Sequence, residues 1–231
     1  MKWYHITGAF GVILLCIAHY MGLFIAPPEA MMGDVGRILY VHVPTAWLSL
    51  VCFLIAFIAA IGSLWTGRRG WDATVVASVE VGVVLTALLL MQGSIWARPT
   101  WGVWWTWDPR LTTSAILIIA FTMVLVMRNV IEQPQRRLTI TAILTILAFV
   151  DVPIVYYAAD WFASLHQDHS SPETVSKPMV LVLRTGAFGM LFLSLGFIGA
   201  RRQIALRENE DIADALPERP AELLLGEEGR S

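Results

Sequence analysis

Four tryptophans stand within seven positions of this sequence, between residues 101 and 107, and Asp108 follows them. Arg98 and Arg110 flank the segment. Indole faces stack on flat apolar surfaces, and arginine pairs with carboxylates in a bidentate geometry. These residue types therefore suit a planar apolar ligand that carries carboxylates along one edge, and Arg37 is a third cation that such an edge can use. The four residues are Trp101, Trp104, Trp105 and Trp107.

A membrane anchor is the alternative explanation for the same tryptophans. Tryptophan is enriched at membrane–water interfaces, where its ring lies at the level of the lipid headgroups. One or two tryptophans would need no other explanation, but four in one short segment favour a ligand-binding surface. Haem is planar and apolar with a carboxylate edge, so it fits the ligand that the segment predicts.

The local structure of this segment has two readings, which do not exclude each other. If it is helical, Trp101, Trp104, Trp105 and Asp108 fall on one helix face, at i, i+3, i+4 and i+7. Alternatively, Asp108 is the N-cap of a following helix and Pro109 its first residue, because proline lacks a donor and disfavours helix in the residue before it.

Histidines are the residues that would bind a haem iron, which takes axial imidazole nitrogens. His42, His166 and His169 lie in regions that we expect at one face of the protein. Considered alone, each is as consistent with an interfacial or loop residue as with a ligand, and spacing does not decide between His166 and His169. For His19, inside an apolar stretch, we expect a hydrogen bond between helices.

The composition indicates the elements that must position these residues. The chain has 231 residues, is 57% hydrophobic and 15% charged, and has a mean hydropathy of +0.65. A membrane crossing needs about 20 apolar helical residues, and backbone groups in lipid must form their hydrogen bonds within the segment. We therefore predict an all-α integral membrane protein with six transmembrane helices. The predicted stretches are 6–26, 45–65, 75–96, 111–127, 138–158 and 179–200.

The distribution of lysine and arginine predicts the orientation, because cytoplasmic loops carry an excess of both. Nine flank one face and five the other, so we expect both termini in the cytoplasm and the tryptophan loop, about residues 97–110, outside. Residues 1–200 form the predicted membrane domain, and residues 201–231 a cytoplasmic tail that is partly disordered. The nine are Lys2, Arg68, Arg69, Arg128, Arg136, Arg137, Arg201, Arg202 and Arg207; the five are Arg37, Arg98, Arg110, Lys177 and Arg184.

Two acidic residues, Glu80 and Asp151, lie inside the predicted membrane helices. Charges there are costly, so each needs a partner or a proton. They either form a proton or ion pathway or link helices; we favour the link, and Pro153 predicts a kink beside Asp151. Cys16 and Cys52 form no CxxC motif and are expected in the core.

Several functional classes lack their sequence signals. The net charge is −2 and no basic stripe for nucleic acid is present. No Walker A or GxGxxG motif is present, so any nucleotide chemistry would belong to a partner. We therefore expect a protein that contacts membrane lipid and binds a ligand, and not an enzyme.

The sequence GSIWARPTWGVWWTWDPRLT at 93–112 resembles the tryptophan-rich "WWD" signature of haem-handling membrane proteins, in the branch called cytochrome c maturation protein C (CcmC). The resemblance includes YVHVP at 40–44 and the stretch from VPIVYY at 152–157 through LHQ at 165–167, and spans residues 35–195. It implies that His42 and His166 are the two axial ligands of haem b, held without a covalent bond. It also implies a haem-binding loop made of Trp101, Gly102, Trp104, Trp105, Trp107, Asp108 and Arg110.

The resemblance further implies a function and partners. The protein would bind haem at the outer face of the bacterial inner membrane and deliver it to the periplasmic haem chaperone CcmE during cytochrome c assembly. CcmA, which binds ATP, CcmB and the small CcmD would complete the complex. The alternatives are a haem-translocating permease, whose signs are broken helices and polar residues near the midplane, and a b-type cytochrome subunit for electron transfer.

Overall fold

The computed structural model describes residues 2–30, 32–166 and 176–215, and the described chain is almost entirely helical. Six helical segments are long and apolar enough to cross a membrane, which confirms the predicted fold class. The fifth segment contains two helices, α5 and α6. The elements are α1 (Trp3–Tyr20), η1 (Met21–Ile25), η2 (Asp34–Ile38), α2 (Leu39–Thr66), α3 (Arg69–Trp101), α4 (Pro109–Val130), α5 (Pro134–Phe149), α6 (Asp151–Trp161) and α7 (Lys177–Ala215).

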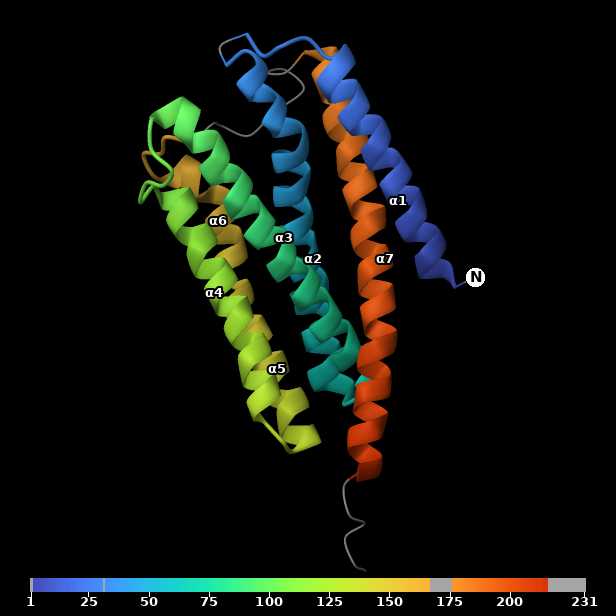
Figure 1. Ribbon diagram of the computed structural model, residues 1–231. Coiled ribbons are helices and arrows are strands. Elements are labelled where there is room, and N and C mark those ends of the chain that lie inside the picture. Colours follow the sequence, from blue (N-terminus) through green and yellow to red (C-terminus); the bar gives the residue numbers. More distant parts are fainter. Residues whose placement is uncertain (1, 31, 167–175, 216–231) are drawn as a thin grey trace, which may run out of the picture.

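The helices form two groups joined through a central pair (Figure 1). Helices α2 and α3 pack along each other, α7 pairs with α1 on one side of them, and α4 lies with α5 and α6 on the other. The connections after η1, after α3 and after α6 gather at the end drawn uppermost. The short turns at 67–68 and 131–133 lie at the opposite end. The described parts of these three connections therefore share one end of the bundle.

Close backbone contact holds α1 against α7. A Cβ added at Gly11 would lie 2.4 Å from the backbone nitrogen of Leu193, and one at Gly196 would lie 2.7 Å from the Cα of Gly8. Small residues at such positions let membrane helices approach closely, which van der Waals packing in lipid requires. Both glycines therefore serve packing between helices.

The second crossing begins earlier than its apolar stretch predicts. Helix α2 begins at Leu39, directly after the 3-10 helix η2, so His42 lies in its first turn and Pro44 inside it. Arg37 in η2 donates hydrogen bonds to the carbonyl oxygens of Gly22 and Ala26, at the π-helical end of the first crossing. This bonding fixes the first outer connection against α2.

The fifth crossing is broken near Pro153. Helix α5 ends at Phe149 and α6 begins at Asp151. Proline at 153 removes the donor for the carbonyl oxygen four residues earlier, that of Phe149, which accounts for the break. Asp151 Oδ2 is buried and, in the described part of the chain, has no hydrogen-bond partner.

The other intramembrane charge is paired. Glu80 on α3 accepts hydrogen bonds from Arg201 on α7 at 2.5 and 2.9 Å, which is the helix link that we expected. The predicted hydrogen bond from His19 to another helix is not found for its Nδ1. This nitrogen bonds to the Leu15 carbonyl oxygen of its own helix, 2.7 Å away. Cys52 is buried as expected, whereas Cys16 is exposed on α1.

Candidate haem site

A pocket of about 110 Å³ opens at the end of the bundle where the connections after η1, α3 and α6 gather. It lies among α2, α3, α4 and α6 and is closed by parts of two connections. Along α2 its lining runs from Leu39 to Leu50, about 16 Å at about 1.5 Å per residue. The residues used below that line it are His42, Leu89, Leu90, Trp96, Trp101, Trp105, Arg110, Leu117, Tyr156 and His166.

The rings of His42 and His166 lie close together at one end of this pocket. Their centroids lie 6.5 Å apart and their planes differ by 28°. Two imidazoles that share one metal need about this separation, because a metal–imidazole bond is about 2 Å, as at zinc, and each ring centre lies about 1 Å behind its nitrogen. The fold therefore brings together two histidines that stand far apart in the sequence.

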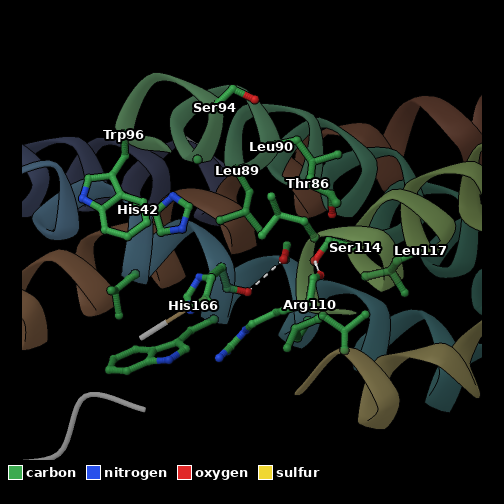
Figure 2. A pocket seen from close by; sticks show the side chains of 18 of the residues that line it. His42, Thr86, Leu89, Leu90, Ser94, Trp96, Arg110, Ser114, Leu117 and His166 are labelled. Carbon is green, nitrogen blue, oxygen red and sulfur yellow. Dashed lines mark hydrogen bonds between the residues drawn. The ribbon is translucent and has the colours of Figure 1, made fainter. Parts of the chain in front are cut away.

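Two buried nitrogen atoms at the histidine pair have no hydrogen-bond partner among the described residues. They are His42 Nδ1 and the indole Nε1 of Trp96. Buried polar groups are normally hydrogen-bonded, so unpaired ones at a pocket indicate a missing ligand or water. The Trp96 ring lies 6.5 Å from that of His166, and Figure 2 shows His42, Trp96 and His166 together at the same end of the pocket.

The opposite end of the pocket is apolar. Leu89 and Leu90 of α3 and Leu117 of α4 line it, with Thr86 and Ser114 among them (Figure 2). Both hydroxyls donate to carbonyl oxygens of their own helices, Thr86 to Gly82 and Ser114 to Arg110. This end therefore offers an apolar surface, while the imidazoles lie at the other end.

The tryptophan loop is a turn and not a helix, so the prediction of one helix face was wrong. Helix α3 ends at Trp101 because Gly102 adopts a left-handed conformation, with φ of +80°. Residues 102–108 are non-helical until α4 begins at Pro109. Glycine is the residue that takes this conformation without a steric cost.

The loop divides its tryptophans between two environments. Trp101 and Trp105 line the pocket, and the Trp101 ring meets that of Trp96 edge to face. Trp104 and Trp107 are 59% and 80% exposed and are not among the lining residues. Gly102 and Asp108 do not line this pocket either.

Asp108 is the N-cap of α4, as the Asp-Pro sequence predicted. Its Oδ1 accepts a hydrogen bond of 2.9 Å from the backbone N–H of Arg110. It also reaches the connection after α6, where it accepts bonds from Ser164 Oγ at 2.8 and 3.0 Å and from the Leu165 N–H at 2.7 Å. Burial raises the pKa of the Asp108 carboxyl, but the hydrogen bonds from Ser164 and from backbone N–H groups outweigh it and hold the pKa below its ordinary value.

Of the three arginines considered for a carboxylate edge, only Arg110 lines the pocket. Arg37 is bonded to Asp34 at 2.8 Å and to the carbonyl oxygens at the end of the first crossing. Arg98 donates to the Gly102 carbonyl oxygen and lies 6.0 Å from the centre of the Trp104 ring. These two arginines therefore fix the connections and do not face the pocket.

Some residues of the site were not predicted as such. Trp96 precedes the cluster by five positions but lines the pocket with Trp101, on the same helix end. Its spacing from Trp101 carried a weak signal. Ser164 carried none, because nothing in the sequence shows that the connection after α6 returns to α4. Tyr156 lies in the VPIVYY stretch of the resemblance, which gave it no role. His169, the other histidine considered as a ligand, lies outside the described residues.

Comparison with known proteins agrees with the resemblance. The family model described as "CcmC: Heme exporter protein C" matches residues 1–214. Heme exporter protein C of Bradyrhizobium diazoefficiens is 32% identical over 85% of this chain and 76% of its own length. That of Escherichia coli K12 is 31% identical over 85% and 82%. A putative ccmC-like mitochondrial protein of cytochrome c biosynthesis from Arabidopsis thaliana is 29% identical over 79% and 70%. The chain belongs to the CcmC family, the family of heme exporter protein C.

Proposed function

We propose that this protein binds haem b between His42 and His166 at the outer face of the bacterial inner membrane and delivers it to the periplasmic haem chaperone CcmE. Haem is the cargo, and the protein supplies binding and orientation without catalysing a reaction on it. The observation that carries the proposal is the histidine pair, with centroids 6.5 Å apart at the mouth of one pocket. Family membership supports the same ligand.

The pocket has surfaces suited to each part of the haem molecule. Trp101 and Trp105 provide indole faces for the porphyrin, the apolar end receives its hydrocarbon edge, and Arg110 pairs with a carboxylate. The unpaired Nδ1 of His42 is compatible with a ligand at this place. Trp104, Trp107 and the Gly102 turn form the exposed part of the loop, which meets the haem edge and the recipient during transfer.

Delivery to a recipient explains why these loop residues are exposed. A carrier that must release haem needs an accessible edge, whereas a b-type electron-transfer subunit has its ligand pairs within helices at depth, and His166 here lies in a connection. CcmA, CcmB and CcmD are the proposed companions. The short turns at the other end, which arginines flank, face the cytoplasm in this arrangement. A permease remains the second candidate because α5 and α6 form a broken crossing with Asp151 at the break.

Purified variants test the ligands. His42→Ala and His166→Ala should each lose or weaken bound haem, with loss of the six-coordinate absorption spectrum, while the protein stays in the membrane. His169→Ala is the matched control and should bind haem as the wild type does. A double variant, His42→Ala with His166→Ala, that keeps a wild-type spectrum would overturn the ligand assignment.

Two further measurements separate the alternatives. Covalent haem on CcmE should fall with bound haem in each ligand variant when both are measured in cells that make equal amounts of protein. A redox titration in which a quinol donor reduces the bound haem quickly would instead favour the electron-transfer subunit. Haem uptake into vesicles that contain this chain alone would favour the permease.

A further inference from the structure

A polar link joins the tryptophan loop to the connection that carries His166. Ser164 Oγ donates its hydrogen to the carboxylate of Asp108, with distances of 2.8 Å to Oδ2 and 3.0 Å to Oδ1. The same Ser164 oxygen accepts a hydrogen bond of 3.0 Å from the backbone N–H of His166. The backbone N–H of Leu165 bonds directly to Asp108 Oδ2 at 2.7 Å.

We propose that Ser164, through Asp108, is a positioning residue that holds His166 in place to bind the haem iron. This inference rests on the proposed function of His166 as a ligand. It assigns a role to a residue that the family signature does not include. It also gives Asp108 a second task, apart from any contact with haem or with a recipient.

The described start of the connection after α6 lies largely at the surface, so a polar link of this kind can determine its conformation. Helix α6 ends at Trp161, and the side chains of Phe162 and Leu165 are 55% and 61% exposed. An exposed connection has many accessible conformations, and ordering each residue costs free energy. Two donors on consecutive residues bond to this single carboxylate, the Ser164 hydroxyl, whose one hydrogen lies near both oxygens, and the Leu165 N–H. They restrict those conformations directly before His166.

Asp108 is itself held rigidly, so it can serve as the fixed end of the link. The residue is 7% exposed, and its Oδ1 accepts the Arg110 N–H while its backbone carbonyl accepts that of Thr112. The carboxylate is thereby attached to the first turn of α4. Since α4 also contributes Arg110 and Leu117 to the pocket, the link sets His166 relative to the walls that surround the ligand.

A serine at 164 suits both bonds, because a hydroxyl donates one hydrogen and accepts another. Alanine removes both bonds, whereas threonine retains the hydroxyl. In Ser164→Ala, the Leu165 N–H still reaches Asp108, so the connection should remain attached but less well ordered at His166. The expected loss of haem affinity is about tenfold, which corresponds to about 1.4 kcal/mol.

The experiment uses the full-length protein in detergent, titrated with haemin. Ser164→Ala should bind haemin about tenfold more weakly, with a five-coordinate high-spin fraction that free imidazole converts to the six-coordinate spectrum. Ser164→Thr should restore both properties. Ser63→Ala, a buried serine at the opposite end of α2, is the control for removal of a hydroxyl. Imidazole cannot correct a general loss of folding, so this rescue separates positioning from structural damage.

A second readout does not depend on haem. With Cys16 replaced by serine, a spin label at Leu165→Cys reports the mobility of the connection in haem-free protein. Ser164→Ala should make the label more mobile, and Ser164→Thr should not. If Ser164→Ala fails to fold, Asp108→Asn is measured instead, because it keeps one oxygen for the cap and weakens the link.

The outcomes distinguish this inference from the proposed function. If His166→Ala loses the six-coordinate spectrum while Ser164→Ala keeps wild-type haemin affinity, spin state and label mobility, the positioning role is wrong and the ligand assignment stands. If His166→Ala keeps the wild-type spectrum, the proposed function itself fails.

Discussion

The rings of Trp96 and Trp101 meet edge to face, with centroids 5.0 Å apart, where α3 ends. Helix α3 has 33 residues, or about 50 Å at about 1.5 Å per residue, so it extends beyond a hydrocarbon layer of about 30 Å. Its last two turns thereby carry both indoles to the end of the pocket where His166 lies. The pair forms a wall of the pocket, whereas Trp104 lies past the turn at Gly102.

We therefore expect the tryptophans of the loop to differ in function. Trp101→Ala and Trp105→Ala should lower bound haem, because both rings line the pocket. Trp104→Ala and Trp107→Ala should leave bound haem close to wild type and reduce covalent haem on the recipient, because both rings are exposed. Bound and transferred haem are measured in the same cells at equal protein level.

An interfacial belt makes a different prediction for the same four tryptophans, which phenylalanine substitutions test. Phenylalanine would replace tryptophan adequately at every position, since a belt requires only aromatic bulk. Wild-type amounts of both bound and transferred haem in Trp101→Phe, Trp105→Phe and their double variant would return the loop to that role.

Cysteine labelling tests the orientation. With Cys16 replaced, Val103→Cys should react with a membrane-impermeant reagent in cells whose outer membrane has been permeabilised, because the tryptophan loop faces outward in our prediction. Glu132→Cys, in the turn between α4 and α5, should react only after lysis. Both positions are exposed in the structure. The reverse pattern would place the pocket on the cytoplasmic side.

A buried ion pair at the opposite end of the bundle stabilises the fold. Arg128 on α4 donates two hydrogen bonds to Asp72 on α3, at 2.7 and 2.8 Å, and both side chains are less than 10% exposed. Asp72→Asn should lower the free energy of unfolding by about 3–5 kcal/mol, because it removes the negative charge that the buried Arg128 guanidinium bonds twice. The measurement is equilibrium unfolding in mixed micelles.

The control is an ion pair of the same residue types at the surface. Asp34 pairs with Arg37 and is 79% exposed, so Asp34→Asn should cost about 1 kcal/mol or less. The double variant Asp72→Leu with Arg128→Met should recover much of the loss, since an apolar pair avoids the cost of burying charge. Equal effects of Asp72→Asn and Asp34→Asn would contradict this account.

The crossings were predictable because each depends on a local property, a run of about 20 apolar residues. The N-cap at Asp108 and the break before Pro153 were predictable for a similar reason, since proline restricts the backbone next to it. The early start of α2 was not, because η2 and the bonds from Arg37 depend on a contact with the first crossing.

Which residues line the pocket was only partly predictable. The resemblance indicated His42 and His166, and the structure places their rings together. Helical spacing failed for the tryptophans because one glycine conformation, at Gly102, redirects the chain after Trp101. Ser164 had no signal at all, since its role depends on where a connection returns in space.

The pH dependence of stability should report the environment of Asp108. Its pKa in the folded protein is lowered, because hydrogen bonds from Ser164 and backbone N–H groups outweigh the effect of burial. The carboxylate therefore stabilises the fold above the ordinary aspartate pKa of about 3.9. This contribution declines as the pH falls below that value and is lost once the pH passes the lowered pKa of the folded state.

The comparison of haem-free wild type with Asp108→Asn isolates this contribution. The wild type should have the higher thermal midpoint at neutral pH, with a difference that is constant down to about pH 5 and then narrows as the pH falls toward 3. Asp34→Asn is the matched removal of an exposed carboxylate and should change the midpoint little at neutral pH. In a Ser164→Ala background, the difference in thermal midpoint between Asp108 and Asp108→Asn should be smaller, because one of the hydrogen bonds that lower the Asp108 pKa is removed. A wild-type advantage that stays unchanged between pH 6 and pH 3 would show that the ionised carboxylate of Asp108 is not what holds the two connections together.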